Sequence, residues 1–252
     1  MVVETTRGQS EFVGVSSVER EQLHLLYRRS NVCGLKRLSA HLVLIVIAAV
    51  GVHQTESIQL YIPAAFVLGV VGTFLFAPLH ESIHRTAFRS RWLNDTVARV
   101  AGFLLLLPPR YFRSFHLSHH RHTQVSARDP ELVGKNVSTF GRYLIHVSGV
   151  LYWRDGIFIL IRHALGQVTA PFIGRTISQS IINEARCYLC IYVLLAVLSA
   201  MFQTSVLVTF WLVPAILGQP ILRLYLLAEH TLCPLIPDML RNSRTTLTLL
   251  PV

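Results

Sequence analysis

Four long apolar runs constrain the fold of this chain more than any other feature. They cover Leu38–Val52, Leu60–Leu79, Cys187–Phe202 and Leu207–Ala228. A helix needs about 20 apolar residues to cross the hydrocarbon core of a bilayer, with a range of roughly 17–25. The second and fourth runs reach that length, and the first and third reach it with flanking residues. We therefore expect an all-α, multi-pass integral membrane protein with four transmembrane helices arranged as two hairpins.

The composition agrees with a membrane protein. Charged residues make up 14% of the 252 residues and hydrophobic residues 52%, whereas ordinary soluble domains are roughly 25% charged. Lys and Arg outnumber Asp and Glu by 23 to 13. The sequence nevertheless contains no run of five basic residues and no nucleic-acid-binding motif, so we expect no nucleic-acid partner.

The positions of the basic residues predict the orientation in the membrane. All Lys and Arg lie in three segments, 1–37, 80–186 and 223–252. The two short connections between the apolar runs, 53–59 and 203–206, contain none. Short loops rich in Lys and Arg stay on the cytoplasmic side. Both termini and the central segment are therefore predicted to be cytoplasmic.

The segment between the two hairpins is predicted to be a helical cytoplasmic cap. Asn94 or Asp95 can cap a helix that runs to Leu107 and is stopped by the two prolines that follow. Residues 140–162 combine aromatic side chains with arginines, a mixture typical of helices at the level of the lipid headgroups. The sequence leaves open whether these helices lie on the membrane or pack as a separate cap.

Twelve histidines are many for so apolar a chain, and five of them form two close sets. His80 and His84 are four positions apart, and His116, His119 and His120 follow within the string HLSHHRH. Residues spaced i, i+3 and i+4 project from one face of a helix. Several imidazoles on one face either repel one another when protonated or need partners when buried. Neutral imidazole suits iron, zinc and copper, so the pattern predicts one metal site shared by both sets.

The first histidine set also matches a second metal motif. His80-Glu81-Ser82-Ile83-His84 reads HExxH, the pattern of zinc proteases, with Glu81 as the candidate general base. An intramembrane protease would leave the second histidine set unused, and its candidate third ligand, Asp155, lies outside the apolar runs. We keep this protease as a remote alternative. Under the favoured hypothesis Glu81 orients an imidazole.

The order of these features resembles the membrane fatty acid desaturase family, and particular strings look like its bacterial-type branch. These strings are HESIHRTAF at 80–88, SFHLSHHRHT at 114–123, ARDPEL at 127–132, RLYLLAEHT at 223–231 and PDMLRNSRTT at 237–246. The resemblance implies a di-iron oxidoreductase that desaturates a fatty acyl or related lipid chain, with O2 as co-substrate. It also implies an external electron donor such as ferredoxin or a cytochrome. A lipid or carotenoid hydroxylase or ketolase of the same superfamily remains an alternative.

The resemblance also implies a set of iron ligands when it is carried over by position. His230 matches a ligand position just after the fourth span, and a third HxxHH box is expected beyond the string RTT. No histidine follows His230 in this chain. We therefore expect a cytoplasmic N-terminal segment at 1–37 and a C-terminally incomplete desaturase-like membrane domain at 38–252, with an incomplete di-iron centre and impaired activity. The implied ligands are His80, His84, His116, His119, His120 and His230.

Overall fold

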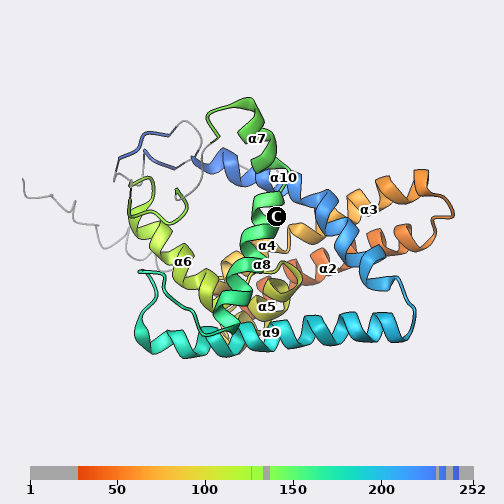
Figure 1. Cartoon of the computed structure of the whole chain (residues 1–252), viewed down its shortest axis with the longest axis horizontal. Helices are drawn as coiled ribbons and strands as arrows, with labels where there is room; N and C mark the ends of the chain where they lie inside the picture. The colour runs from red at the N-terminus through yellow and green to blue at the C-terminus, as the bar shows by residue number, and fades with distance from the viewer. Residues whose placement is uncertain (1–27, 126, 133–136, 231–232, 237–240, 244–252) are drawn as a thin grey trace, which may run out of the picture.

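The computed structural model describes residues 28–125, 127–132, 137–230, 233–236 and 241–243, and all regular secondary structure within them is helical. Most of the expected N-terminal segment lies outside these residues, as does most of the string at 237–246. Figure 1 shows how the helices are arranged. They are α2 (Asn31–His53), α3 (Ile58–Thr73), α4 (Phe76–His84), α5 (Arg91–Leu104), α6 (Pro109–His122), α7 (Phe140–Val147), α8 (Val150–Ala164), α9 (Arg175–Met201), the π-helical turn η1 (Val208–Leu212) and α10 (Val213–His230).

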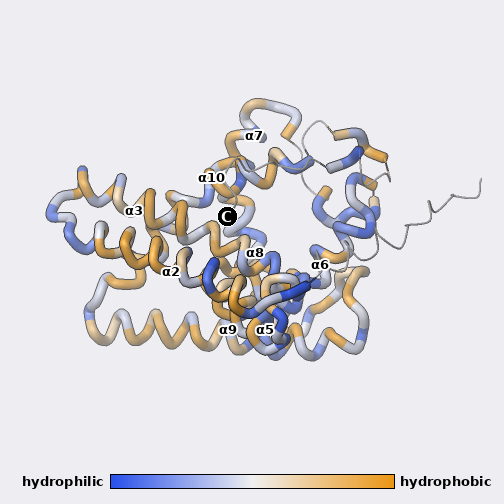
Figure 2. Tube along the Cα trace, turned by 180° about the vertical axis from the view of Figure 1, so that it is seen from behind, coloured by the Kyte–Doolittle hydropathy of each residue, from blue (hydrophilic) through white to orange (hydrophobic). Residues whose placement is uncertain are grey.

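Four stretches of the described chain are long and apolar enough to cross a membrane, which confirms the predicted number of spans. The second stretch joins α3 and α4 across a short break, and α7 and α8 pass the same test only as a pair bent by 57°. In Figure 2, apolar residues dominate α2, α3 and the left half of α9, whereas hydrophilic residues gather around α5 and α6. The four stretches are Asn31–His53, Ile58–His84, Arg175–Met201 and Val208–His230.

Helices α3 and α10 cross at very short range. A Cβ atom added to Gly218 would lie 2.1 Å from the carbonyl carbon of Gly69, and one added to Gly69 would lie 1.9 Å from the carbonyl oxygen of Pro214. Small residues permit such an approach between membrane helices, whose association relies on close packing. Within the described residues α10 packs mainly on α3, while α9 packs on α8 and α6. The glycine crossing therefore fixes α10, which ends at His230, against the helix that leads into α4.

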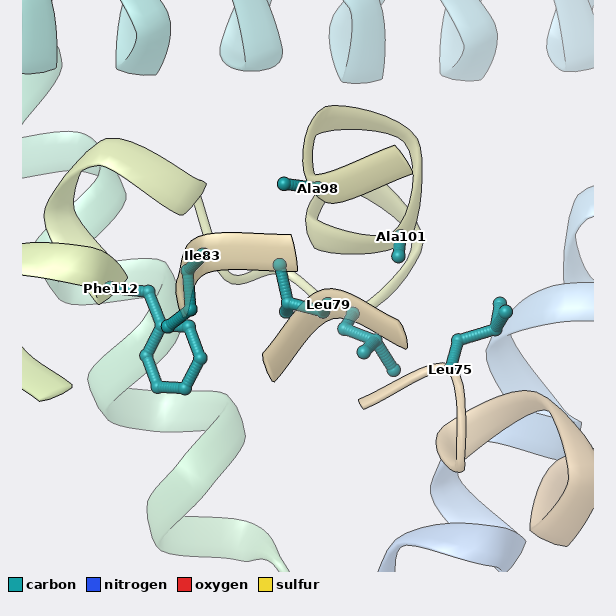
Figure 3. Packing of buried hydrophobic residues seen from close by; sticks show 7 residues of the cluster. Leu75, Leu79, Ile83, Ala98, Ala101 and Phe112 are labelled. Atoms are coloured by element: carbon teal, nitrogen blue, oxygen red, sulfur yellow. The ribbon is translucent and has the colours of Figure 1, made fainter. Parts of the chain in front are cut away.

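A small apolar core joins α4 to α5 and α6. Leu79 and Ile83 of α4 pack against Ala98 and Ala101 of α5 and against Phe112 of α6, as Figure 3 shows. The two alanines allow the helix backbones to approach closely. Full burial of a Leu, Ile or Phe side chain contributes roughly 1.5–3 kcal/mol. This core therefore sets the rotation of α4 relative to α6.

The C-terminal end of α5 is surrounded by aromatic hydrogen-bond donors. The last carbonyl groups of a helix have no partner within that helix. Side chains of α8, α9 and η1 donate here to the carbonyls of Phe103, Leu104 and the following Leu105, and to that of Arg99 about one turn earlier. These contacts hold α8, α9 and η1 around the C-terminal end of α5. The donor and acceptor pairs are Tyr188 hydroxyl to Arg99 carbonyl (2.6 Å), Tyr192 hydroxyl to Phe103 carbonyl (2.6 Å), Trp211 Nε1 to Leu104 carbonyl (2.9 Å), and Tyr152 hydroxyl to Leu105 carbonyl.

Helix α5 begins earlier than predicted. It covers Arg91–Leu104 with Ser90 at the N-cap position, so the expectation that Asn94 or Asp95 caps it is wrong. Asn94 is buried, and its amide donates to the carbonyl oxygens of Phe88 at 2.8 Å and Ser90 at 2.9 Å. Its Oδ1 accepts from the backbone N–H of Phe88 at 3.3 Å. The side chain is used to fix the turn between α4 and α5, a tertiary role that its helix-capping preference does not reveal.

Replacing Gly218 with alanine should destabilise the protein, because the added methyl group overlaps the backbone of Gly69. Overpacking of this kind costs about 1–3 kcal/mol, so we expect a lower Tm for Gly218→Ala in detergent. Gly72→Ala is the matched control: it lies on α3, and its added Cβ has no atom within 4 Å. Equal melting temperatures for the two variants would contradict the tight crossing.

Candidate metal centre

Helix α4 presents two histidines toward α6. His80 and His84 lie one turn apart, with their ring centroids 4.7 Å from each other. The helix stops directly after them, because Arg85 adopts a left-handed conformation with φ 62° and its N–H bonds back to the last turn. Burial of Leu79 and Ile83 in the apolar core fixes the rotation of the helix. Both imidazoles are thereby held at the end of the second candidate span.

Helix α6 carries three more histidines and is anchored at its start. Pro109 occupies its first position, where a missing N–H costs nothing and the fixed φ suits a helix. The buried carboxylate of Glu184 on α9 accepts the backbone N–H of Arg110 at 2.9 Å, and its other oxygen lies 3.7 Å from Nε of Arg110. A negative charge at a helix N-terminus is favourable. Glu184 thus ties α6 to the third candidate span.

Four imidazoles from α4 and α6 form one compact group, called the four-histidine cluster below. One ring nitrogen from each of His80, His84, His116 and His120 lies within 4.8 Å of all the others. Nε2 of His116 is 2.7 Å from Nε2 of His80 and 2.9 Å from Nε2 of His120. Nε2 of His84 is buried and has no hydrogen-bond partner among the described residues. Converging imidazole nitrogens, one of them buried without a partner, fit the donor set of a transition metal.

The electrostatics of the cluster favour neutral imidazole, the form that binds metals. Burial, followed by repulsion from the neighbouring histidines, lowers the pKa of His116 to about 2. Burial is also the main reason why the pKa of His120 is lowered. Nδ1 of His80 lies 3.0 Å from a carboxylate oxygen of Glu81. A proton held there leaves Nε2 of His80 as a lone pair directed at the cluster.

His119 and His230 form a second group, called the histidine pair below. Their Nε2 atoms are 3.2 Å apart. Nδ1 of His119 lies 2.9 Å from Oδ1 of Asp129, and Nδ1 of His230 lies 3.0 Å from the carbonyl oxygen of Asn242. A carboxylate and a carbonyl only accept hydrogen bonds, so each Nδ1 donates and each Nε2 carries a lone pair. Two lone pairs at this distance repel each other, and binding of both to one metal ion removes the repulsion.

Asp129 contacts a candidate ligand, His119, and sequence reasoning missed it. It is 1% exposed, and its carboxylate also accepts the backbone N–H groups of Gln124 and Glu131, each at 2.9 Å. Burial acts to raise the pKa of Asp129, but the hydrogen bonds from His119 and the two backbone groups outweigh it and lower the pKa. Asp129 is therefore an ionised carboxylate that fixes the tautomer of His119. The one indication of Asp129 in the sequence was its place in ARDPEL, a string that resembles the desaturase family.

Asn242 was missed for a different reason. It receives the His230 Nδ1–H bond through its backbone carbonyl, and a backbone group has no sequence signature. Its side-chain amide donates to the carbonyl oxygens of Thr123 at 2.8 Å and Ile236 at 3.0 Å. Asn242 therefore connects the end of α6 to the residues that follow α10.

The structure brings all six sequence-predicted ligand positions into one region. The ring centroids of His116 and His119 are 5.8 Å apart, which places the histidine pair beside the four-histidine cluster. Glu81 sits at the edge of this region with a side chain that is 54% exposed, and it also accepts a 2.6 Å hydrogen bond from the Thr86 hydroxyl. Four of the six predicted ligands thus form one group and His119 and His230 form another beside it, and metal binding by either group stays a prediction.

Three known proteins that are similar to parts of this chain are named as desaturases. The chain is 28% identical over 124 residues to an sn-1 oleoyl-lipid 12-desaturase of Picosynechococcus sp., a match that covers 45% of this chain and 36% of the relative. It is 32% identical over 80 residues to a Delta(12) fatty acid desaturase of Mortierella isabellina (31% of this chain, 20% of the relative). It is also 32% identical over 84 residues to an endoplasmic reticulum omega-6 fatty acid desaturase of Brassica juncea (32% and 22%). The chain thus spans between about a fifth and about a third of the curated relatives it matches.

A family-level comparison covers far more of the chain. The fatty acid desaturase family matches residues 57–251. That range includes both histidine sets, His230 and the three candidate spans from α3 onward. The chain therefore belongs to the fatty acid desaturase family.

Proposed function

We propose that this chain forms a di-iron centre that desaturates a fatty acyl or related lipid chain in the membrane, with O2 as co-substrate. The observation that carries the proposal is the convergence of six imidazoles in a chain of the desaturase family. The four-histidine cluster would hold one iron ion. The histidine pair would contribute to holding the second.

Bound iron would supply the oxidising chemistry: two hydrogens leave adjacent carbons of the lipid chain, and O2 with two electrons and two protons becomes two water molecules. An external donor such as ferredoxin or a cytochrome would deliver the electrons. The residues of the chain prepare the site for this reaction. Burial of His116 and His119 limits the access of water, and the depressed pKa of His116 keeps its imidazole neutral. Asp129 holds the ring of His119 in one tautomer.

The proposed topology places this site on the cytoplasmic side. The short connections at 53–59 and 203–206 contain no Lys or Arg, so the positive-inside rule puts them outside and both termini inside. Two hairpins would then carry a cytoplasmic cap built from the segment that follows α4. His84 and His230 are the last residues of α4 and α10, where those spans would reach the cytoplasm. An electron donor would approach from the same side.

Two other activities are less well supported. Hydroxylases and ketolases of the same superfamily would use a similar site, but the three relatives are named as desaturases, which favours desaturation. A zinc protease would use His80 and His84 and would give no role to the other four imidazoles. Glu81, its candidate base, contacts His80 and the Thr86 hydroxyl. That position supports an orienting role for Glu81.

Replacing His116 with glutamine should remove most of the bound iron, because Nε2 of His116 contacts both His80 and His120. We expect iron affinity to fall by at least about tenfold, since even outer partners of metal ligands are worth 10–100-fold. Elemental analysis of purified protein after a chelator wash measures the effect. His122→Gln, on the same helix and outside both histidine groups, should keep its iron.

The same pair of variants tests the activity. In a host that supplies an electron donor, any double bonds that the wild-type chain adds to the fatty acid profile should also be added by His122→Gln and should be lost with His116→Gln; the expected incomplete di-iron centre would make the wild-type gain small. An unchanged profile alongside full iron loading would contradict desaturation. Retention of zinc in preference to iron would instead favour the protease.

Replacing Asp129 with asparagine should weaken metal binding at the histidine pair, because the amide no longer holds a negative charge against Nδ1–H of His119. Loss of such a partner typically lowers metal affinity by about 10–100-fold. Competition with a coloured chelator measures the change. Asp155→Asn is the control, since Asp155 is exposed and pairs with Arg154 on α8. Equal affinities in both variants would argue against a positioning role.

Reporter fusions at Gln54 and Gln203 should report an external location, and a fusion at Gly141 a cytoplasmic one. The reason is the absence of Lys and Arg from the connections that contain Gln54 and Gln203. A cytoplasmic signal at either glutamine would overturn the proposed orientation.

A further inference from the structure

A cavity of about 170 Å³ lies where the start of α6 meets the end of α8, and none of the six candidate ligand histidines lines it. Its polar lining consists of Tyr111, Arg162, His163, Gln167 and Thr169, and none of the lining residues is acidic. Ligand pockets for whole small molecules usually measure 300–1,000 Å³. This cavity therefore has room for one small polar group and leaves any larger part of the ligand outside.

One lining side chain has a buried polar atom that lacks a hydrogen-bond partner within the described part of the chain. His163 is 6% exposed, and its Nδ1 is buried and unpartnered. The ring of Tyr111 packs edge-on against the His163 ring at 4.8 Å between centroids. Burial raises the pKa of Tyr111 to about 12, so its hydroxyl remains a donor. A buried polar atom without a partner costs about 1–3 kcal/mol. With the proton of the neutral imidazole on Nδ1, His163 and the Tyr111 hydroxyl offer two donors to a ligand with acceptor atoms.

The charge beside the cavity favours an anion. Among the described residues, the hydrogen bonds of the Arg162 guanidinium are long, at 3.3 Å to Gln167 and 3.4 Å to Thr169. Arginine suits phosphate because its planar fork donates two parallel hydrogen bonds. The negative end of α8 is offset by a second cation, since Nε of Arg186 donates to the carbonyl of Ala164 at 2.8 Å.

The surface around the cavity identifies the source of the anion. Phe158, Ile161 and Leu165 surround Arg162 in sequence and are 58%, 43% and 69% exposed. The Arg162 guanidinium lies over the Phe158 ring at 5.5 Å. Exposed apolar side chains with a neighbouring arginine are typical of a helix that enters the boundary between lipid headgroups and acyl chains. An anion bound at the boundary between headgroups and acyl chains belongs to a lipid.

We propose that this cavity binds the phosphate of a membrane phospholipid, with Arg162, His163 and Tyr111 as its donors and the acyl chains lying against the exposed apolar side chains of α8. This lipid site is separate from the histidines and does not depend on bound iron. It would anchor the end of α8 to the start of α6 at the membrane surface.

The test is lipid retention by the purified full chain, measured by native mass spectrometry in detergent. We expect phosphatidylglycerol to be retained in preference to a galactosyl diacylglycerol with the same acyl chains. Arg162→Gln should weaken phosphatidylglycerol binding about tenfold, because it removes a charge-assisted contact. Tyr111→Phe should weaken it several-fold without changing the charge, and it decides the question if Arg162→Gln does not fold.

Arg154→Gln is the matched control. It removes one arginine from the same helix at an exposed position outside the cavity, and it should bind phosphatidylglycerol like the wild type. Equal losses in the Arg154 and Arg162 variants would reduce the effect to general surface charge and overturn the site. Equal retention of the galactolipid would overturn phosphate recognition. Binding of inorganic phosphate without binding of phosphatidylglycerol would show a soluble anion site and refute the lipid.

Discussion

The centre of this structure depends on imidazole nitrogens that face one another at 2.7–3.2 Å. In the four-histidine cluster, Nε2 of His116 faces two other Nε2 atoms and can donate a proton to only one of them. In the histidine pair both Nδ1 atoms donate, so neutral rings place one lone pair opposite another. A bound metal ion would accept these lone pairs and remove the repulsion between the rings. Without the ion, the surrounding helices must hold the rings together against that repulsion. The scaffold must therefore fix three helices before any ion is bound.

Each of the three helices is fixed by a different kind of interaction. Helix α4 is fixed by apolar burial, since Leu79 is fully buried against α5 and α6. Helix α6 is fixed by charge, through the carboxylate of Glu184 at its N-terminus. Helix α10 is fixed by the absence of side chains, through Gly69 and Gly218 at its crossing with α3. A change in the packing of α4 would directly move only the four-histidine cluster and a change at the α10 crossing only the histidine pair, whereas a change at the start of α6 would move both groups, because α6 carries His116, His119 and His120.

The sequence predicted the parts of this arrangement that follow from periodicity. Four apolar runs gave four candidate spans, and the spacing of His116, His119 and His120 placed them on one side of a helix. Periodicity does not report tertiary hydrogen bonds, so Asn94 was expected to cap a helix although it holds a turn. It also gives no information about backbone acceptors, which is why Asn242 was missed. The pairing of α10 with α3 depends on two glycines far apart in sequence, and their mutual fit exists only once both helices have formed.

The two histidine groups differ in how they are built, and this difference orders their assembly. The four-histidine cluster comes entirely from α4 and α6, so folding of those helices and their shared core is enough to form it. The histidine pair also requires acceptors from non-helical segments, Asp129 and the carbonyl of Asn242. Segments outside helices and spans open more readily than packed helices, so the pair is the group whose geometry is more easily lost. A metal ion bound to His119 and His230 would also hold those segments in place, because metal binding is coupled to the ordering of its ligands. The four-histidine cluster is therefore expected to form first and the pair to be completed around it.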